Sequence, residues 1–114
     1  MEIGVIGLSH KNASVEIREK FAFTTSRKEQ TAKELGQAGV GEFVILSTCN
    51  RTEIYFAGQD IIQTKNTVVT YCEAVFDSDI ARYLYSYEKR NAITHLFRVA
   101  CGLDSLVLGE DQIL

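Results

Sequence analysis

Two strand-forming segments joined by a polar turn constrain the fold of this 114-residue chain more than any other feature. Residues 41–48 contain a continuous apolar run, which is typical of a buried strand, and residues 52–57 alternate between two faces, which is typical of a half-buried one. The segments are close enough to pair as an antiparallel hairpin with Cys49 and Asn50 at its tip. The pattern therefore predicts a sheet and places a thiol where two of its strands meet.

Apolar spacing and helix-capping residues predict the other elements. We expect strands over residues 1–8 and 82–87, a helix after the N-cap Ser14, a helix from a capping box of Ser26 and Glu29 to near Gly39, and helices over 61–76 and 89–102. In the last helix, Ile93, Leu96, Phe97 and Ala100 form the predicted buried stripe, with His95 at its edge. These elements predict an α+β fold, with a mostly antiparallel sheet and helices packed on one face in a ferredoxin-like arrangement.

Composition limits the class of protein. The chain is 46% hydrophobic and 24% charged, without a signal peptide or an apolar run near the roughly 18 residues of a membrane helix. We therefore expect a soluble, cytoplasmic protein with no membrane contact. The net charge of −3 argues against a broad basic surface for a nucleic-acid backbone and leaves only local RNA contact. The three cysteines lack paired spacing, which fits a reducing compartment better than a disulfide framework.

Neither a metal site nor a nucleotide site is expected within these residues. The cysteines and the two histidines lack the short pair spacings that structural zinc uses. Gly4 and Gly7 do not match the G-x-G-x-x-G fingerprint of a dinucleotide-binding turn. We therefore expect no metal and no cofactor-binding residue in this chain.

The chemistry of the turn centres on Cys49. The thiolate is the nucleophilic form, and with a pKa of about 8.5 a free cysteine is mostly protonated at neutral pH. Arg51 lies two residues further on and shares a face with Cys49 in extended geometry, so its cation would favour the thiolate, and Glu53 continues that face. The alternative is that Cys49 is a small buried residue at a strand end and that Arg51 is a solvated charge.

His95 is the candidate partner of Cys49, because an imidazole can take a thiol proton or protonate a leaving alkoxide at neutral pH. It can equally be a hydrogen-bonded histidine at the flank of its helix, and spacing alone does not decide. A polar cluster near residue 110 can either read a polar ligand or cap helices. Its members are Ser105, Glu110, Asp111 and Gln112.

Three segments of the sequence resemble one known family. They are GLSHKNASVEIRE at residues 7–19, LSTCNRTEIY at 46–55 and HLFRVACGLDSLVLGEDQIL at 95–114. Together they resemble the N-terminal catalytic domain of glutamyl-tRNA reductase, in the same order and along the whole chain. The departures are Asn12 where threonine is usual, Ser14 where proline is common and Cys101 where another small residue is usual.

The resemblance implies an enzyme that begins tetrapyrrole (porphyrin) biosynthesis by reducing the glutamyl group of glutamyl-tRNA to glutamate-1-semialdehyde with NADPH. It implies that Cys49 attacks the glutamyl ester and holds glutamate as a thioester, with His95 assisting. A thioester accepts hydride, whereas a carboxylate does not. It also implies substrate-binding residues around a glutamate pocket, with Arg51 pairing a substrate carboxylate. These residues are Thr48, Asn50, Arg51, Ser105, Glu110, Asp111 and Gln112.

Members of the family continue into a spinal helix, an NADPH domain and a dimerisation domain. Residues 1–114 are therefore expected to be a truncated N-terminal catalytic domain that recognises the glutamyl-adenosine end and cannot perform the hydride step alone. The resemblance also implies a homodimer through an absent domain and glutamate-1-semialdehyde aminomutase as a candidate partner. Two other interpretations stay open: a cysteine-dependent hydrolase or acyl transferase, and a non-enzymatic binding module in which Cys49 is structural.

Overall fold

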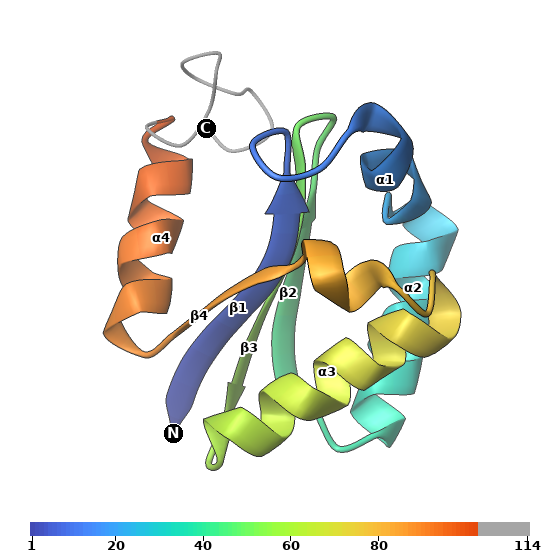
Figure 1. The fold of residues 1–114 in the computed structure, drawn as a ribbon. Coiled ribbons are helices and arrows are strands. Elements are labelled where there is room, and N and C mark those ends of the chain that lie inside the picture. Colours follow the sequence, from blue (N-terminus) through green and yellow to red (C-terminus); the bar gives the residue numbers. More distant parts are fainter. Residues whose placement is uncertain (103–114) are drawn as a thin grey trace.

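The computed structural model describes residues 1–102, which form a four-stranded sheet with helices against it (Figure 1). The elements are β1 (Glu2–Ser9), α1 (Val15–Lys20), α2 (Thr25–Gln37), β2 (Glu42–Ser47), β3 (Arg51–Gly58), α3 (Ile61–Val75), the 3-10 helix η1 (Ile80–Tyr83), β4 (Tyr85–Glu88) and α4 (Arg90–Ala100). The strand order is β2-β3-β1-β4, and each neighbouring pair is antiparallel. This is the ferredoxin-like arrangement, so the predicted α+β fold is confirmed.

The sheet separates two unequal layers. Helices α1, α2 and α3 lie on one face, and α4 lies on the other, next to β1 and β4 (Figure 1). Alternation along the strands explains the division. Leu8 and Ile54 join the main core under the first three helices, whereas Val5 and Tyr55 pack with Ala92 of α4. The predicted helical layer is confirmed, and α4 adds packing on the second face.

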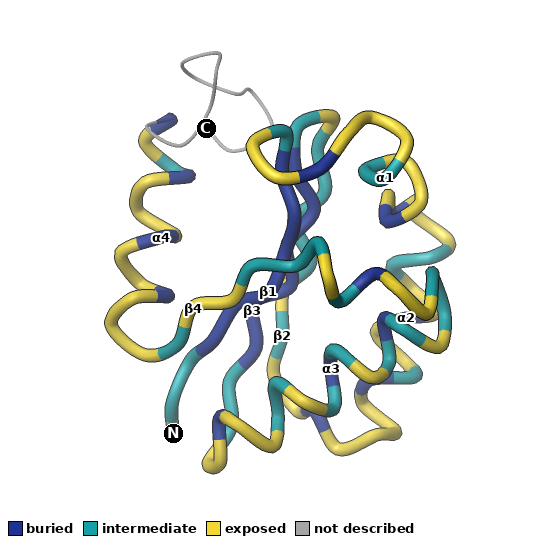
Figure 2. Tube along the Cα trace, viewed as in Figure 1, coloured by how far each residue is buried: buried dark blue, intermediate teal, exposed yellow. Residues whose placement is uncertain are grey.

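The main core joins the two central strands to α2 and α3. Buried residues concentrate along β1 and β3 and on the inner sides of the helices (Figure 2). Among them are Ile6, Leu8, Ile54, Phe56, Leu35, Val68 and Cys72. Cys72 is buried, as the sequence predicts, and this burial raises the pKa of its thiol to about 12. Cys72 is therefore a core residue rather than a nucleophile.

The first two helices show one correct and one wrong prediction of a cap. Ser14 is the N-cap of α1, as expected. The predicted capping box of Ser26 and Glu29 is wrong, because α2 begins earlier: Thr24 is the N-cap, and its Oγ1 accepts the N–H of Arg27 at 3.1 Å. The earlier start lets the Thr24 carbonyl accept the N–H of Lys28 at 2.9 Å, which adds a helical hydrogen bond.

The predicted burial of the strand over residues 41–48 is also wrong. β2 is an edge strand that pairs with β3, and Val44 is exposed. An apolar run shows that a strand has apolar faces, but the position of that strand in a sheet depends on pairing with distant segments. β3 occupies the central position instead. The strand expected over 82–87 is shorter than predicted, because Tyr83 lies in η1 and β4 starts at Tyr85.

Helix α4 is rotated relative to the prediction. Its buried residues are Ala92, His95 and Val99. The residues predicted to form the buried stripe lie outward instead: Ile93, Leu96 and Phe97 are exposed and Ala100 is only partly buried. The rotation has a physical cause, because a small residue at position 92 fits closely against β1 while His95 reaches a hydrogen-bonding partner on β3.

Candidate active site

The turn between β2 and β3 holds Cys49 on a backbone fixed from both sides. The N–H of Thr48 donates to the carbonyl of Arg51 at 2.7 Å, and the Thr48 hydroxyl accepts the N–H groups of Asn50 and Arg51 at 3.2 and 3.3 Å. The end of β1 adds a third anchor, since the N–H of His10 donates to the carbonyl of Asn50 at 2.9 Å. Cys49 itself is exposed. A thiol on a rigid, open turn is accessible to a substrate.

Arg51 begins β3 and turns inward to the α4 side of the sheet. It is only 1% exposed, so the solvated charge considered from the sequence is not what the structure contains. Its Nη1 lies 3.7 Å from Oε2 of Glu53, and Glu53 shares its face of the strand, as predicted. The guanidinium is therefore part of a buried charged cluster that begins two residues after Cys49 in the chain.

Glu53 is the centre of this cluster. Its side chain is fully buried, and its carboxylate accepts the hydroxyl of Tyr55 at 2.7 Å and the hydroxyl of Tyr85 at 2.5 Å. Its Oε2 is also hydrogen-bonded to Nε2 of His95, which reaches across from α4. The register explains the convergence, because Glu53 and Tyr85 both pair with Gly7 of β1 and so lie in one row across the sheet.

The electrostatics of the cluster keep Glu53 ionised. Burial alone raises the pKa of a carboxyl, but hydrogen bonds from His95, Tyr85 and Tyr55 outweigh it and hold the pKa of Glu53 below its ordinary value. Burial and the neighbouring Glu53 charge raise the pKa of Tyr85, so its hydroxyl stays a donor. A carboxylate that is always an acceptor thus faces the imidazole of His95.

His95 lies between the sheet and two openings at the surface. Its ring stacks on Tyr87 with 4.7 Å between ring centroids. A pocket of about 210 Å³ opens beside it towards Ser9 and Lys11, and another of about 270 Å³ opens along α4 towards Arg98. The imidazole is therefore held on its Glu53 side and approachable on another.

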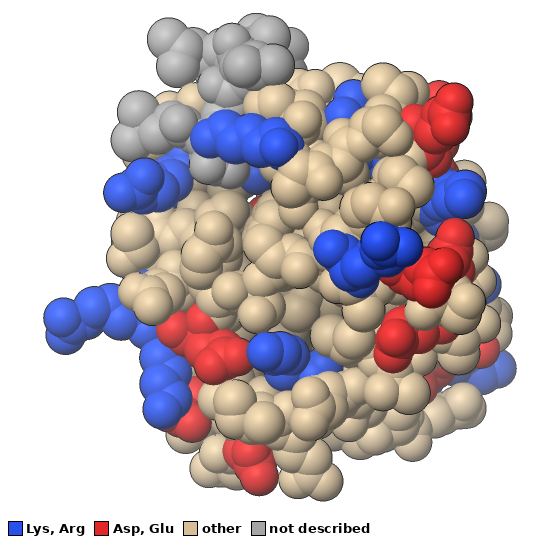
Figure 3. Space-filling model, viewed as in Figure 1, with Lys and Arg blue, Asp and Glu red and all other residues tan. Residues whose placement is uncertain are grey.

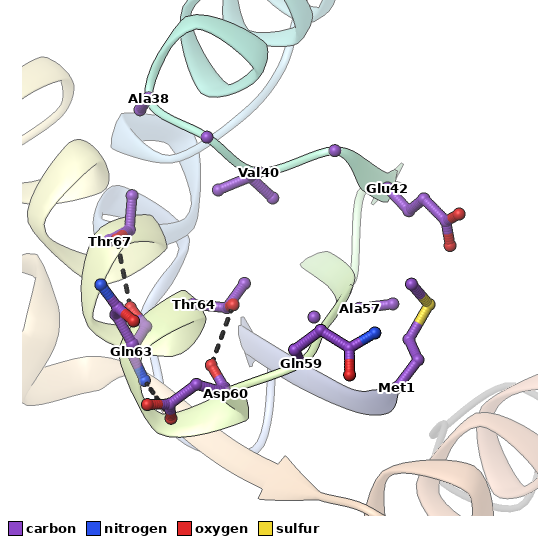
Figure 4. Close-up of a pocket in the computed structure, with 13 residues that line it drawn as sticks. Met1, Ala38, Val40, Glu42, Ala57, Gln59, Asp60, Gln63, Thr64 and Thr67 are labelled. Carbon is purple, nitrogen blue, oxygen red and sulfur yellow. Dashed lines mark hydrogen bonds between the residues drawn. The ribbon is translucent and has the colours of Figure 1, made fainter.

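A larger pocket of about 560 Å³ lies at the opposite end of the sheet (Figure 4). It is formed around the start of α3, the end of β3 and the loop before β2, with Asp60, Gln63 and Thr64 among its polar residues. Neither cysteine nor histidine lines it. Its size does not make it the candidate catalytic site, because none of its side chains is a nucleophile paired with a base.

One face of the molecule shows how its charged side chains are distributed. On the face shown in Figure 3, acidic and basic side chains lie together over the right and lower parts, and the upper left part shows basic side chains. Within residues 1–102, the helices lack the combination of length and hydropathy that crossing a bilayer requires.

The structure brings some predicted site residues together and leaves others undescribed. Thr48, Cys49, Asn50 and Arg51 share the turn, and His95 is linked to Arg51 through Glu53. The Cys49 thiol makes no hydrogen bond to another described residue. The remaining candidates lie outside the described residues: Ser105, Glu110, Asp111 and Gln112.

Three members of the cluster were not predicted as site residues: Glu53, Tyr55 and Tyr85. The contact between Glu53 and His95 was not predicted either. One local signal was present. Ala92, His95 and Val99 are spaced by three and four residues, which is a second helical stripe alongside the more apolar one. A histidine between two small apolar residues of such a stripe is typical of a buried polar contact.

Comparison with known proteins gives one consistent result. Residues 6–114 match the family described as glutamyl-tRNAGlu reductase, N-terminal domain. The chain is 47% identical to a glutamyl-tRNA reductase of Heliobacterium mobile and 38% identical to one of Clostridium novyi (strain NT), over all of its own length and 27% and 28% of theirs. The fold matches a glutamyl-tRNA reductase from Methanopyrus kandleri with a TM-score of 0.72 and 30% identity, over 97% of this chain and 25% of that one. The chain thus spans about a quarter of the length of these relatives. It belongs to the glutamyl-tRNA reductase family and corresponds to the N-terminal domain of that family.

Proposed function

We propose that this domain recognises the glutamyl end of glutamyl-tRNA and transfers the glutamyl group to Cys49, within an oxidoreductase of tetrapyrrole (porphyrin) biosynthesis. The observation that carries the proposal is the exposed Cys49 on a hydrogen-bonded turn that leads within two residues to the buried Arg51 and Glu53 cluster, in a chain of this family. A thiolate on such a turn can attack an activated ester without rearrangement of the backbone.

The proposed step is an acyl transfer. The Cys49 sulfur forms a bond to the glutamyl carbonyl carbon, and the bond from that carbon to the terminal ribose oxygen of the tRNA breaks. The thiol proton passes to His95 and from there to the ribose oxygen, which leaves as a neutral hydroxyl. The products are a glutamyl thioester on Cys49 and free tRNA.

The turn supplies candidates for holding the substrate. We propose that Thr48, Asn50 and Arg51 form the glutamate pocket. Thr48 and Asn50 would contact the glutamyl group directly, and Arg51, whose side chain is buried beside Glu53, would contribute its positive charge to the binding of a substrate carboxylate. The remaining proposed substrate-binding residues are Ser105, Glu110, Asp111 and Gln112. A carboxylate such as Glu110 would suit the α-ammonium group of the substrate.

Gly4 and Gly7 do not form a dinucleotide-binding turn. A dinucleotide-binding turn needs its glycines between a strand and a helix, but Gly4 and Gly7 both lie inside β1. A Cβ atom at Gly7 would lie 2.7 Å from Glu53, so this glycine leaves room for a side chain rather than for a phosphate. We propose that reduction of the thioester to glutamate-1-semialdehyde uses NADPH bound elsewhere in a longer protein.

The setting of the activity follows from the same proposal. We place the enzyme in the cytoplasm, with glutamyl-tRNA as its substrate and a homodimer formed through a region outside these residues. Because the product would be a reactive aldehyde, direct transfer to glutamate-1-semialdehyde aminomutase is the partner interaction that we propose.

Mass spectrometry of the chain after mixing with glutamyl-tRNA tests the acyl transfer. We expect a glutamyl adduct on the peptide that contains Cys49, and none with Cys49→Ser. Cys101→Ser is the matched control, because Cys101 is also exposed but lies at the end of α4. An adduct that persists in Cys49→Ser and disappears in Cys101→Ser would overturn the assignment of the nucleophile. Release of free glutamate without a trapped adduct would favour the hydrolase.

A further inference from the structure

Among residues 1–102, the buried carboxylate of Glu53 has several hydrogen-bond partners but no role in the acyl-transfer step as written above. Placing an ionised carboxylate in a protein interior is costly unless hydrogen bonds or opposite charges compensate. Here Tyr55, Tyr85 and His95 all hydrogen-bond to it, and Arg51 lies 3.7 Å away. Three of these partners come from different elements, β3, β4 and α4, so the fold converges on this group.

The backbone also makes room for Glu53. Gly7 is its cross-strand partner, and a Cβ atom there would lie 2.7 Å from Cγ of Glu53 and 2.7 Å from the carbonyl oxygen of Thr52. Any side chain at position 7 would push the carboxylate from its place. The Glu53 side chain is therefore held towards α4. The residues around it that fix this orientation are Gly7, Arg51, Tyr55 and Tyr85.

This geometry determines which ring nitrogen of His95 carries the proton and which can accept one. An ionised carboxylate can only accept, so Nε2 of His95 carries a proton and donates it to Glu53. In the neutral ring the proton is then absent from Nδ1, which leaves Nδ1 as the acceptor. Tyr87 stacks on the ring face and limits its rotation. The same logic orients the imidazole in catalytic triads, where a buried carboxylate selects the tautomer.

We propose that Glu53 is a positioning residue: it holds His95 in the tautomer protonated on Nε2, so that Nδ1 takes the proton of the Cys49 thiol and returns it to the leaving ribose oxygen. This inference rests on the proposed acyl transfer and adds Glu53 to Cys49 and His95 as a residue that takes part in it. Glu53 touches neither substrate nor thiol, and it acts through His95. The carboxylate also stabilises the imidazolium that exists between the two proton transfers.

Nitrogen NMR of the histidine rings tests the tautomer directly. The chain has two histidines, so ¹⁵N-histidine labelling gives two sets of ring signals, and His10→Gln assigns them. At alkaline pH we expect His95 to show a protonated Nε2 and an unprotonated Nδ1. A His95 ring that is protonated on Nδ1 in the unmodified chain would overturn the proposal without any need for a variant.

Substitution tests the link to Glu53. In Glu53→Gln the amide can donate as well as accept, so we expect a mixed tautomer at His95. We expect thioester formation to be slowed roughly 10- to 100-fold, the range found for hydrogen-bond partners of metal-bound histidines. Glu53→Asp keeps the charge beside Arg51 but withdraws the carboxylate by one methylene, so it should show the same direction of change in a folded protein. Glu34→Gln is the matched control, because Glu34 also accepts hydrogen bonds from a tyrosine and an arginine but lies on α2.

The outcomes separate this inference from the proposed function. An unchanged tautomer and an unchanged rate in Glu53→Gln and Glu53→Asp overturn the positioning role, even where Cys49 forms a thioester. If the unmodified chain shows the expected tautomer and both Glu53 variants lose it, the positioning role is supported. If that same unmodified chain forms no thioester, the acyl transfer alone is overturned.

Discussion

At the scale of single residues, the site combines an exposed thiol with a buried polar network. Cys49 is open on its turn, whereas Arg51, Glu53 and His95 are 1%, 0% and 6% exposed. The network lies in a region of low dielectric, where charges interact strongly and unpaired groups are costly. Its members are therefore coupled to the stability of the fold as well as to any chemistry at Cys49.

This coupling predicts a pH dependence of stability that originates at Glu53. Its pKa in the folded chain is lower than the ordinary value of 4.5, so folding favours the ionised form. The unfolded chain therefore binds more protons in the window between the two pKa values. The resulting stabilisation is complete above about pH 4.5 and is lost as the pH falls through the folded pKa.

Urea unfolding between neutral and acid pH measures this dependence. We expect the free energy of unfolding to fall less steeply with acid in Glu53→Gln than in the unmodified chain. Glu34→Gln should change the slope less, because the pKa of Glu34 is also lowered but its carboxylate is far more open to solvent. Equal slopes for the unmodified chain and Glu53→Gln would contradict the assigned ionisation.

At the scale of elements, the orientation of α4 sets the geometry of the site. The helix presents two possible faces, and the structure buries the one with Ala92, His95 and Val99. The more apolar face, with Ile93, Leu96 and Phe97, is exposed within the described part of the chain. The buried face gains the hydrogen bond from His95 to Glu53 together with close packing against β1.

Two truncations on α4 test this orientation. Val99 is 2% exposed and Phe97 is 66% exposed. We expect Val99→Ala to lower the free energy of unfolding by roughly 1–3 kcal/mol, because it removes buried methyl groups and leaves a cavity. Phe97→Ala should change it by less than about 0.5 kcal/mol, as is usual at exposed positions. A larger loss at Phe97 than at Val99, measured by urea unfolding, would show that the helix is turned the other way.

At the scale of the whole molecule, the two faces of the sheet pack against different kinds of residue. The face under α1, α2 and α3 contains the main apolar core, and the face under α4 contains the polar network of Arg51, Glu53 and His95. Stability thus rests mainly on one layer, which leaves the other free to bury charged groups. This arrangement is consistent with the proposed acyl transfer, in which NADPH binds elsewhere in a longer protein.

Because NADPH is proposed to bind elsewhere, we predict that the reaction catalysed by this chain ends at the thioester on Cys49. With glutamyl-tRNA and NADPH together, we expect the glutamyl adduct on Cys49 to accumulate and the fluorescence of NADPH to stay constant. The matched reaction without NADPH should give the same amount of adduct. Consumption of NADPH with release of an aldehyde would contradict the proposal, because it would show that these 114 residues bind and use the cofactor.

Local sequence determined much of this protein. The pattern around residues 41–57 predicts the hairpin and puts Cys49 at its tip, and the N-cap at Ser14 and the end of α2 near Gly39 are also as expected. These features depend on residues close in sequence, where periodicity, capping and turn chemistry act directly. The motif segments likewise point to the family that the comparisons establish.

Tertiary structure alone decided the rest. The hydrogen bond between Glu53 and His95 joins residues 42 apart, and the one between Glu53 and Tyr85 joins residues 32 apart. The edge position of β2 and the rotation of α4 likewise follow from pairing and packing between distant elements. Hydrophobic periodicity ranks the faces of a helix by apolar content, but burial is decided by the free energy of the complete contact, hydrogen bonds included. For that reason the thiol could be located from the sequence, whereas the carboxylate that orients its proposed base could not.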